Sequence, residues 1–236
     1  MERILLVVHP EGDGQLGRSA REALSAAVAL TPADGELTVA VFGAQAEAAA
    51  AGLGGCGARR FLAVEDSRLG QPRYATDAAA VCALVRASGA EIVVAPGTSR
   101  LSRALPGVAQ RCGGSIDTRI TGLQREANGI QVERWYYRQR LVARLARTQR
   151  PWFLLLAPGV AAAYEGGTAP VHVERVEVEL SSRTQVEGTE APAVSAQTIR
   201  PEADLLLVAG AGWTKKQPDG SRRTDEAGKL ILEFLE

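Results

Sequence analysis

Short apolar runs alternate with alanine-rich stretches through the first half of the chain. The runs cover residues 4–8, 37–42, 61–64 and 92–95 and are nearly continuous in Val, Ile, Leu and Ala. Strands that are buried on both faces have this composition, and the stretches between them have helical spacing. The alternation therefore predicts an α/β domain in which crossover helices cover both faces of a parallel sheet.

Two of the predicted helices carry further signals. Ser19 and Glu22 have the spacing of a capping box, in which both side chains bind free amides at the start of a helix. The buried stripe of this helix is predicted to consist of Leu24, Ala27 and Val28. The buried side of a helix over residues 74–87 is predicted to consist of Ala78, Val81, Cys82 and Val85. Cys82 is accordingly expected in the core, with a structural role.

The pattern changes after Cys112. Runs at 129–133 and 140–144 alternate or are rich in β-forming residues, which predicts antiparallel strands added to the parallel sheet. Residues 152–157 predict another buried strand. Residues 171–180 alternate apolar and polar positions almost without fault, so we expect a strand with one wet face, at a sheet edge or facing a partner.

The second half of the chain also contains a predicted domain boundary. Residues 181–203 are rich in Ser, Thr, Glu, Ala and Pro and lack periodicity, which indicates a linker between a domain over 1–180 and a second α/β segment over 204–236. That segment is predicted to start with a buried strand that runs into the turn Gly210-Ala211-Gly212. A helix over 225–235 follows, with its apolar stripe formed by Leu230, Ile231 and Phe234. Since a strand, a turn and a helix are only half of a βαβ unit, this second domain is expected to be incomplete and truncated.

Composition narrows the classes of protein. Of the 236 residues, 46% are hydrophobic, which is ample for a globular core. Lys and Arg number 27 and so do Asp and Glu, so no net field draws the chain to nucleic acid or an anionic membrane. Cys56, Cys82 and Cys112 fit neither a disulfide framework nor paired zinc ligands, which favours a reducing cytoplasm. The apolar run at the N-terminus is too short for a membrane span and lacks the features of a signal peptide.

Several residues are candidates for ligand binding. Gly210-Ala211-Gly212 is either a phosphate-cradling loop or a plain tight turn, because its glycines allow close approach but a polar loop separates it from the next helix. Thr98 and Ser99 follow a predicted strand, where ligands bind in open α/β sheets, yet capping of the next helix is the preferred role. His9 is predicted to be a solvated loop residue, and His172 to lie on the wet face of a strand.

A basic and aromatic stretch runs from Arg134 to Arg140 and continues with Arg144, Arg147 and Arg150. Such a stretch can bind phosphates and stack bases. A row of Arg134, Arg138 and Arg140 on one face of a strand pair is more often a solvated or partner-facing surface, so no nucleic acid is expected. The sequence offers no carboxylate pair, activated nucleophile or metal cluster, so an enzyme in the usual sense is not predicted.

The order of these segments resembles the alpha subunit of electron-transfer flavoproteins. The resemblance rests on residues 4–16, 95–103, 151–159 and 208–212, whose order and spacing are more specific than any one of them. It implies a heterodimer of alpha and beta subunits that carries FAD, takes electrons from dehydrogenases and passes them to a quinone-reductase-type acceptor. It also implies that a Rossmann-like alpha N-terminal domain holds the subunits together, that the alpha C-terminal domain grips FAD, and that the beta subunit holds AMP. Thr98 and Ser99 are then not expected to bind nucleotide.

The sequence departs from that family at three places. Ala211 stands where the family usually has an arginine that helps to hold FAD, so only the backbone amides of Gly210, Ala211 and Gly212 remain as predicted FAD contacts. The segment 137–140 replaces one that is often small and glycine-rich, which changes the surface offered to the beta subunit. The later flavin-contacting strands are not in the sequence, so the chain alone is not expected to bind FAD well. The alternative is a non-redox Rossmann-like binding or scaffold module that has lost FAD binding.

Overall fold

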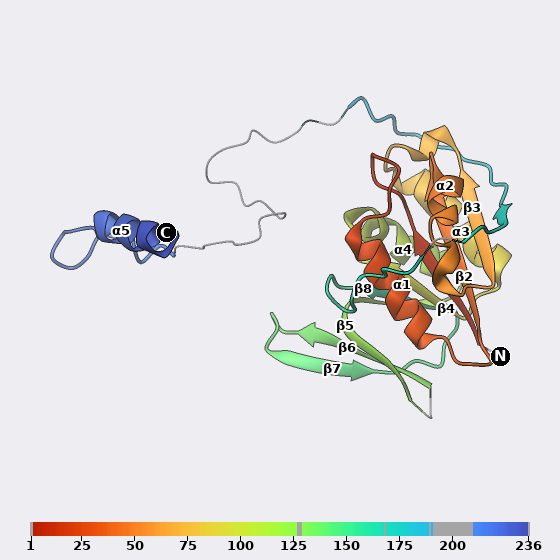
Figure 1. Ribbon diagram of the computed structural model, residues 1–236, viewed down its shortest axis with the longest axis horizontal. Helices are drawn as coiled ribbons and strands as arrows, with labels where there is room; N and C mark the ends of the chain where they lie inside the picture. Colours follow the sequence, from red (N-terminus) through yellow and green to blue (C-terminus); the bar gives the residue numbers. More distant parts are fainter. Residues whose placement is uncertain (1, 127–128, 168, 189, 191–209, 236) are drawn as a thin grey trace. The chain divides into compact units, whose positions relative to one another are not determined.

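The structure is a computed structural model that describes residues 2–126, 129–167, 169–188, 190 and 210–235. The chain divides into two compact units, Met1–Glu187 and Gly188–Glu236 (Figure 1). The first unit contains all the described strands and four of the α-helices, and the second contains one α-helix.

The first unit is built on one nine-stranded sheet with the strand order β7-β6-β5-β8-β4-β1-β2-β3-β9. The strands are β1 (Arg3–Val8), β2 (Glu36–Gly43), β3 (Arg60–Glu65), β4 (Ile92–Pro96), β5 (Ser115–Glu126), β6 (Gly129–Tyr136), β7 (Leu141–Leu145), β8 (Trp152–Leu156) and β9 (Val173–Arg175). Neighbouring strands are parallel from β5 to β9 in this order, whereas β6 pairs antiparallel with both β5 and β7. The predicted Rossmann-like parallel sheet with added antiparallel strands is confirmed.

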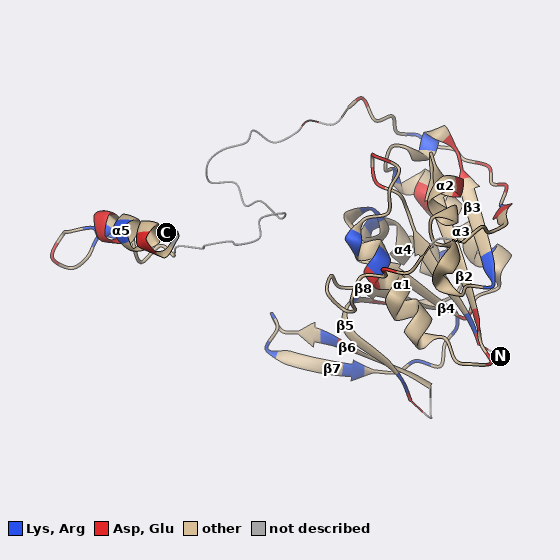
Figure 2. Cartoon of the chain, in the orientation of Figure 1, with Lys and Arg blue, Asp and Glu red and all other residues tan. Residues whose placement is uncertain are grey.

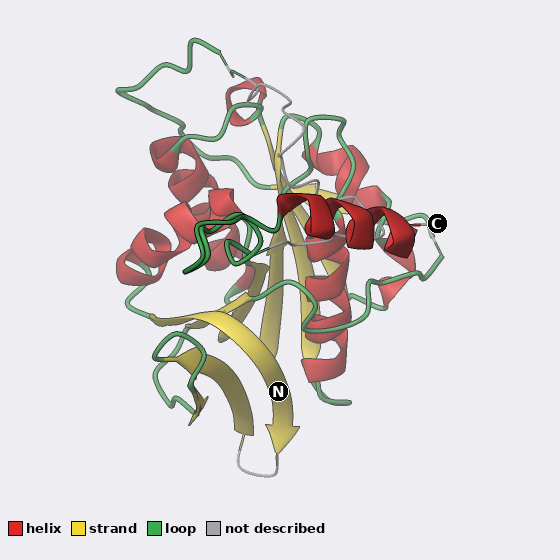
Figure 3. Cartoon of the chain, turned by 90° about the vertical axis from the view of Figure 1, so that its left-hand side faces the viewer, coloured by secondary structure: helices red, strands yellow, loops and turns green. Residues whose placement is uncertain are grey.

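Helices cover both faces of the parallel part of the sheet (Figure 3). They are α1 (Arg18–Leu30), α2 (Ala46–Ala51), α3 (Tyr74–Ser88) and α4 (Ser99–Arg111), with short 3-10 turns at Gly54–Cys56 and Ser67–Leu69. Ile4, Leu6 and Val8 of β1 pack in one hydrophobic cluster with side chains of α1 and α2. Leu5 and Val7 pack in the other cluster, with α3 and α4. Because successive strand residues point to opposite faces, a strand buried on both sides must be apolar throughout.

The predicted capping box at the start of α1 is wrong. The helix begins at Arg18, and its N-cap is Gly17, which has no side-chain hydrogen bond, so Ser19 lies inside the helix. The buried Glu22 carboxylate accepts hydrogen bonds from Arg18 Nε at 2.9 Å and from Gly159 N at 2.7 Å. A contact with the loop after β8 therefore takes this carboxylate away from the helix terminus.

The predicted buried stripes of α1 and α3 are correct except at one position. Leu24 and Ala27 of α1 are buried, but Val28 is 37% exposed because it lies at the edge of the buried arc. The predicted buried residues of α3, namely Ala78, Val81, Cys82 and Val85, all lie in the core.

The alternating segment 171–180 forms a shorter strand than predicted. Only β9 is strand, and it pairs with β3 at the edge of the sheet, which confirms the edge position. Val173 packs on the cluster of α1 and α2, whereas Val176, Val178 and Leu180 pack on the cluster of α3 and α4. The alternation thus reflects a chain that passes around the sheet edge from one cluster to the other, and the prediction of a continuous strand with one wet face is wrong.

The antiparallel strands β6 and β7 form a hairpin that projects from the helix-covered part of the sheet (Figure 1). Arg138 and Arg140 were predicted to share a strand face with Arg134, but both lie in the turn between the two strands. The turn takes its shape from positive φ angles at Tyr137, Arg138 and Gln139. Regular alternation cannot continue through such a turn, which explains the error.

The second unit contains α5 (Thr224–Leu235), which confirms the helix predicted over 225–235. Leu230 and Phe234 of its predicted stripe are exposed, and Ile231 is half-buried. The predicted strand before the glycine turn falls on residues 204–209, which lie outside the described residues, as does much of the predicted linker. Across the described ranges, no helix has the length and apolar character needed to cross a membrane.

Candidate functional site

The strand order places a topological switch point between β1 and β4. From β1 the chain moves through β2 and β3 on one side, and then returns to β4 and continues to β5 on the other. Ligands of open α/β sheets bind at the carboxyl ends of the strands at such a point. His9 directly follows β1 and Thr98 follows β4, so these two residues flank the crevice.

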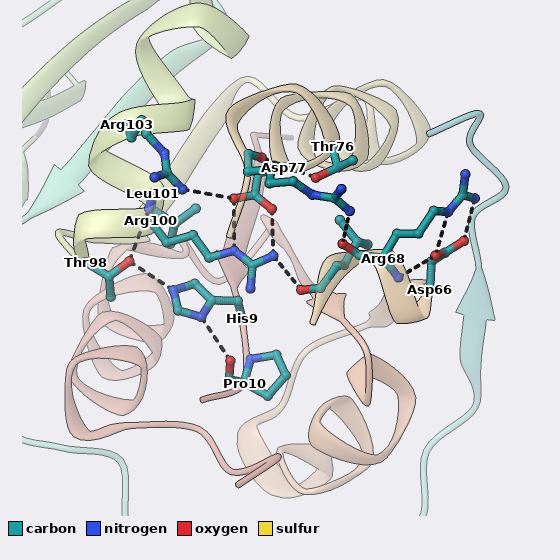
Figure 4. Close-up of polar contacts among 12 residues, drawn as sticks. His9, Pro10, Asp66, Arg68, Thr76, Asp77, Thr98, Arg100, Leu101 and Arg103 are labelled. Atoms are coloured by element: carbon teal, nitrogen blue, oxygen red, sulfur yellow. Dashed lines mark hydrogen bonds and ion pairs between the residues drawn. The ribbon is translucent and has the colours of Figure 1, made fainter. Parts of the chain in front are cut away.

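His9 and Thr98 bridge the switch point through a hydrogen bond of 3.0 Å between Nε2 and Oγ1 (Figure 4). His9 Nδ1 lies 3.1 Å from the carbonyl oxygen of Pro10, which can only accept, so Nδ1 carries the proton. In the neutral ring Nε2 then accepts from the Thr98 hydroxyl. The hydroxyl oxygen also accepts from Leu101 N at 3.2 Å, as the N-cap of α4.

Capping by Thr98 is therefore confirmed, while Ser99 is exposed at the first position of α4. The prediction that His9 is a solvated loop residue is wrong. Its ring is partly buried and packs edge-on against Phe42, with 5.8 Å between the ring centroids. Burial lowers the pKa of His9 below its ordinary value, and the positive charge of Arg100 acts in the same direction. The imidazole is consequently neutral at pH 7.

A buried ion pair that the sequence analysis did not identify lies beside this bridge. Arg100 donates from Nε to Asp77 Oδ2 at 3.0 Å and from Nη2 to Asp77 Oδ1 at 2.6 Å (Figure 4). The Arg100 and Asp77 side chains are 9% and 0% exposed. The guanidinium also donates to the Leu69 carbonyl oxygen at 2.7 Å and lies 4.8 Å from the centroid of the Phe42 ring. Burial of both charges is tolerated because each is paired and hydrogen-bonded.

His9, Thr98, Asp77 and Arg100 are named the switch-point cluster. Arg100 and Asp77 lie in the first turns of α4 and α3, where neither residue has a distinctive sequence signal. The cluster joins the loops after β1 and β4 to the starts of these helices, and its donors are used within the chain. These hydrogen bonds bridge the crevice, so the Thr98 hydroxyl and the Arg100 Nε and Nη2 groups are already bound within the chain and are not free for a phosphate. Among the described residues, no group of His, Cys, Asp and Glu is arranged to hold a metal ion.

The predicted FAD contacts Gly210, Ala211 and Gly212 lie in an exposed turn of the second unit. The Ala211 carbonyl oxygen accepts from Thr214 N at 3.2 Å and from Lys215 N at 2.8 Å. Gly212 borders a hollow of about 730 Å³, whose wall includes the cationic residues Lys215, Lys216 and Arg223. Within the described residues Lys215 and Lys216 form no ion pair, whereas Arg223 Nε lies 3.9 Å from Glu226 Oε2. The first turn of α5 carries Asp225 and Glu226, so the start of this helix does not itself favour an anion.

In the structure, the arginines of the basic stretch differ in their ion pairing between the base and the tip of the hairpin. At the base, Asp117 is buried and accepts hydrogen bonds from Arg147 and from Trp152 Nε1, the latter at 2.9 Å. The hydrogen bond with Arg147 holds the pKa of Asp117 below its ordinary value. Arg144 donates to Glu133 at 2.7 Å across β6 and β7. Figure 2 shows further basic positions at the tip of the hairpin. Arg138 and Arg140 in the turn form no ion pair within the described part of the chain.

Cys82 is buried as predicted, but it has a neighbour that the sequence analysis missed. The thiol of Cys112, at the C-cap of α4, lies beside it, and the hydrogen bond between the two thiols lowers the pKa of Cys82 and raises the pKa of Cys112. The Arg111 and Arg86 guanidiniums also lower the pKa of Cys82. The two cysteines are far apart in sequence, so only the packing of α3 against α4 brings them together. No disulfide is formed by the described cysteines.

Comparison with known protein families gives one decisive result. Residues 5–181 match the family described as "Electron transfer flavoprotein domain", which covers nearly all of the first unit. The chain belongs to this family. A search of curated proteins found no match.

Electron transfer flavoprotein domains belong to flavin-associated electron carriers and act with a protein partner in an electron-transfer complex. The family match thus supports an electron carrier rather than a catalyst. The match ends before the glycine turn, so Gly210, Ala211 and Gly212 lie beyond the matched domain.

Proposed function

We propose that this chain acts as an alpha-subunit-like component of an electron-transfer flavoprotein, in an FAD-containing heterodimer with a beta subunit. The hydrogen bond that bridges the switch point carries the proposal. The beta subunit of the family holds AMP, whereas in this chain the crevice between β1 and β4 is bridged by His9 and Thr98. The first unit then serves assembly with the partner, and electrons pass from dehydrogenases to a quinone-reductase-type acceptor through the complex.

The donors around the switch point support this assignment. A nucleotide phosphate needs free donors, and the hydroxyl of Thr98 is occupied by His9 and the amide of Leu101. The guanidinium of Arg100 is bound to Asp77 and to the Leu69 carbonyl oxygen. A nucleotide at this point would have to break contacts that are buried and well paired, which is unfavourable.

The FAD contacts in this proposal fall to the second unit. Gly210 and Gly212 leave the backbone of the turn open, and Lys215 and Lys216 supply positive charge for a pyrophosphate. When bound, FAD supplies the capacity to take up and release electrons. This chain holds one end of the cofactor, and the partner completes its enclosure. The complex works in the cytoplasm, where the free cysteines stay reduced.

Co-purification with an electron-transfer flavoprotein beta subunit tests the heterodimer. We expect a one-to-one complex that retains a flavin absorption spectrum through gel filtration, whereas the chain alone retains little flavin. Unassociated subunits in a monodisperse mixture would contradict the proposal. Titration calorimetry of the chain alone with AMP tests the subunit assignment. No heat of binding is expected, and micromolar affinity for AMP would identify a beta-like subunit instead.

A second candidate function is a non-redox binding or scaffold module that has lost FAD binding. The observation that favours it is Ala211, because the turn lacks the arginine that helps to hold FAD in the family. This candidate predicts a colourless complex with the partner. Replacing Ala211 with Arg should then restore flavin retention, while Gly210→Ala/Ala211→Arg serves as a control for turn geometry. Flavin in the wild-type complex would exclude it.

A further inference from the structure

A pocket of about 670 Å³ lies at the tip of the β6–β7 hairpin and reaches the bulged part of β5. Its lining includes Arg119, Arg134, Arg138, Trp135, Tyr136 and Tyr137. This hollow, which Gln139 also lines, is named the turn pocket. It shares no residue with the switch-point cluster or with the glycine turn, so neither of those sites explains it.

The backbone of the turn pocket is strained. In the described part of the chain, the non-glycine residues with positive φ are Arg119 at 56°, Tyr137 at 46°, Arg138 at 53° and Gln139 at 68°. All of them line the turn pocket. At Arg119 the strain coincides with a register shift between β5 and β8. Left-handed backbone at bulky residues is costly and concentrates at binding sites, so its restriction to one pocket indicates a function.

The charges of the turn pocket are poorly compensated within the chain. Arg119 and Arg138 are exposed, and neither forms an ion pair across the ranges that the structure describes. Arg134 Nη1 lies 3.8 Å from Asp117 Oδ1, and its buried Nε has no hydrogen-bond partner among the described residues. The base of the same hairpin is different, because Arg144 is paired with Glu133 at 2.7 Å.

The exposure of the aromatic rings helps to distinguish whether the turn pocket binds a small ligand, a nucleic acid or a protein. Tyr137 is 76% exposed, and a small ligand in such an open hollow would keep much of its own surface in water. Trp, Tyr and Arg are the residues most enriched at the energetic centres of protein interfaces. The overall charge of the chain is zero, which does not favour a nucleic acid. The turn pocket thus fits an acidic surface of a protein.

We propose that the turn pocket binds a carboxylate-bearing loop of the partner subunit, with Arg119 and Arg138 pairing with its acidic side chains. The inference rests on the proposed function for the identity of that subunit. It adds that charge at the hairpin tip selects the partner. An acidic loop that matches Arg119 and Arg138 would discriminate in favour of a chain that carries both charges.

The test compares two charge-removing variants of the complete chain in binding to the beta subunit. Arg119→Asn/Arg138→Asn removes the free charges, and asparagine is well tolerated at positive φ. Arg144→Gln is the matched control, because it removes a charge that is already paired within the hairpin. We expect the dissociation constant to rise by about tenfold or more for the double variant at low salt, and by less than about twofold for the control. Added salt should reduce the difference.

Each outcome distinguishes the inference from the function on which it rests. A wild-type complex whose affinity is unchanged in the Arg119→Asn/Arg138→Asn variant would overturn the inference and leave the proposed function intact. No complex with the wild-type chain would overturn both. Tight binding of a short single-stranded oligonucleotide, lost in the double variant, would also overturn the inference, since the pocket would then serve nucleic acid. Melting temperatures of both variants show that a loss of affinity does not arise from unfolding.

Discussion

Two arginines of this chain lie at the same distance from an aromatic ring yet have different surroundings. Arg100 of the switch-point cluster lies 4.8 Å from the centroid of Phe42, and Arg134 of the turn pocket lies 4.8 Å from that of Tyr136. Arg100 is also held by two hydrogen bonds to Asp77. The cation–π contact is common to both sites, so it does not explain why the switch-point cluster is buried whereas the turn pocket is exposed.

The carboxylate beside each arginine explains why the charge of Arg100 is fully paired and that of Arg134 is not. Asp77 faces Arg100 alone at hydrogen-bond distance, with Arg103 farther away at 3.7 Å. Asp117 is already bound by Arg147 and Trp152, so it offers Arg134 only a 3.8 Å contact. At the switch point the chain supplies the counter-charge for Arg100, and the pair is buried. At the hairpin tip Arg119 and Arg138 have no such counter-charge among the described residues, so their charge stays available for a partner.

Of the variants that test this comparison, removal of Asp77 should change the free energy of unfolding the most. Asp77→Ala leaves the buried Arg100 without its counter-charge, and we expect a loss of about 3–5 kcal/mol in the free energy of unfolding. Glu133→Ala breaks the exposed pair with Arg144 on the hairpin and should cost less than about 1 kcal/mol. Urea unfolding followed by circular dichroism measures both. Equal losses would mean that burial does not separate the two regions.

A double variant sharpens the interpretation of that result. Asp77→Leu/Arg100→Met removes both charges and keeps the apolar volume beside Phe42, so most of the stability should return. If the double variant is as unstable as Asp77→Ala, the loss comes from packing and not from an uncompensated charge.

Thr98 should give an intermediate effect. Thr98→Ala removes the N-cap of α4 and leaves His9 Nε2 without its donor, which we expect to cost about 1–2 kcal/mol in urea unfolding. Thr98→Ser retains the hydroxyl and should keep most of the stability. A serine variant as weak as the alanine variant would show that the methyl group of Thr98, and not its two hydrogen bonds, stabilises the crevice.

The layers of the fold could be predicted from the sequence because a strand that is buried on both faces is apolar at every position. The continuous apolar run of β1 is necessary for packing on two helix layers, and α1 and α3 were predicted from the helical spacing of their apolar residues. Thr98 was predicted as a cap because capping depends on neighbouring residues alone. Predictions of this kind succeed when the physical cause is local.

The candidate site was only partly predictable, because its contacts join distant parts of the chain. Glu22 has the local spacing of a capping box, yet Gly159 N, far along the sequence, takes its carboxylate. Asp77 and Arg100 likewise have no local signal for their pairing. At the hairpin tip, the strand-like composition of residues 137–140 conceals a left-handed turn that regular patterns do not anticipate. The role of Gly210, Ala211 and Gly212 in FAD binding stays a prediction.

The smallest effect should come from the titration of His9. Burial lowers its pKa in the folded chain, so the unfolded chain binds a proton at higher pH than the folded chain does. Stability contributed by the neutral ring is therefore complete above about pH 6.5 and falls as the pH decreases from there toward the lowered pKa, with a slope of at most about 1.4 kcal/mol per pH unit.

Urea unfolding between about pH 5 and pH 7.5 measures that slope. Glu11 and Asp77 oppose the shift, and Arg100 adds to it, so the slope reports the whole cluster around the ring. His9→Gln cannot titrate and should flatten the profile in this window, whereas Arg144→Gln on the hairpin should leave it unchanged. A slope that persists in His9→Gln would assign the proton uptake to another group, and the crevice would then owe its stability to the Asp77–Arg100 pair and the Thr98 cap alone.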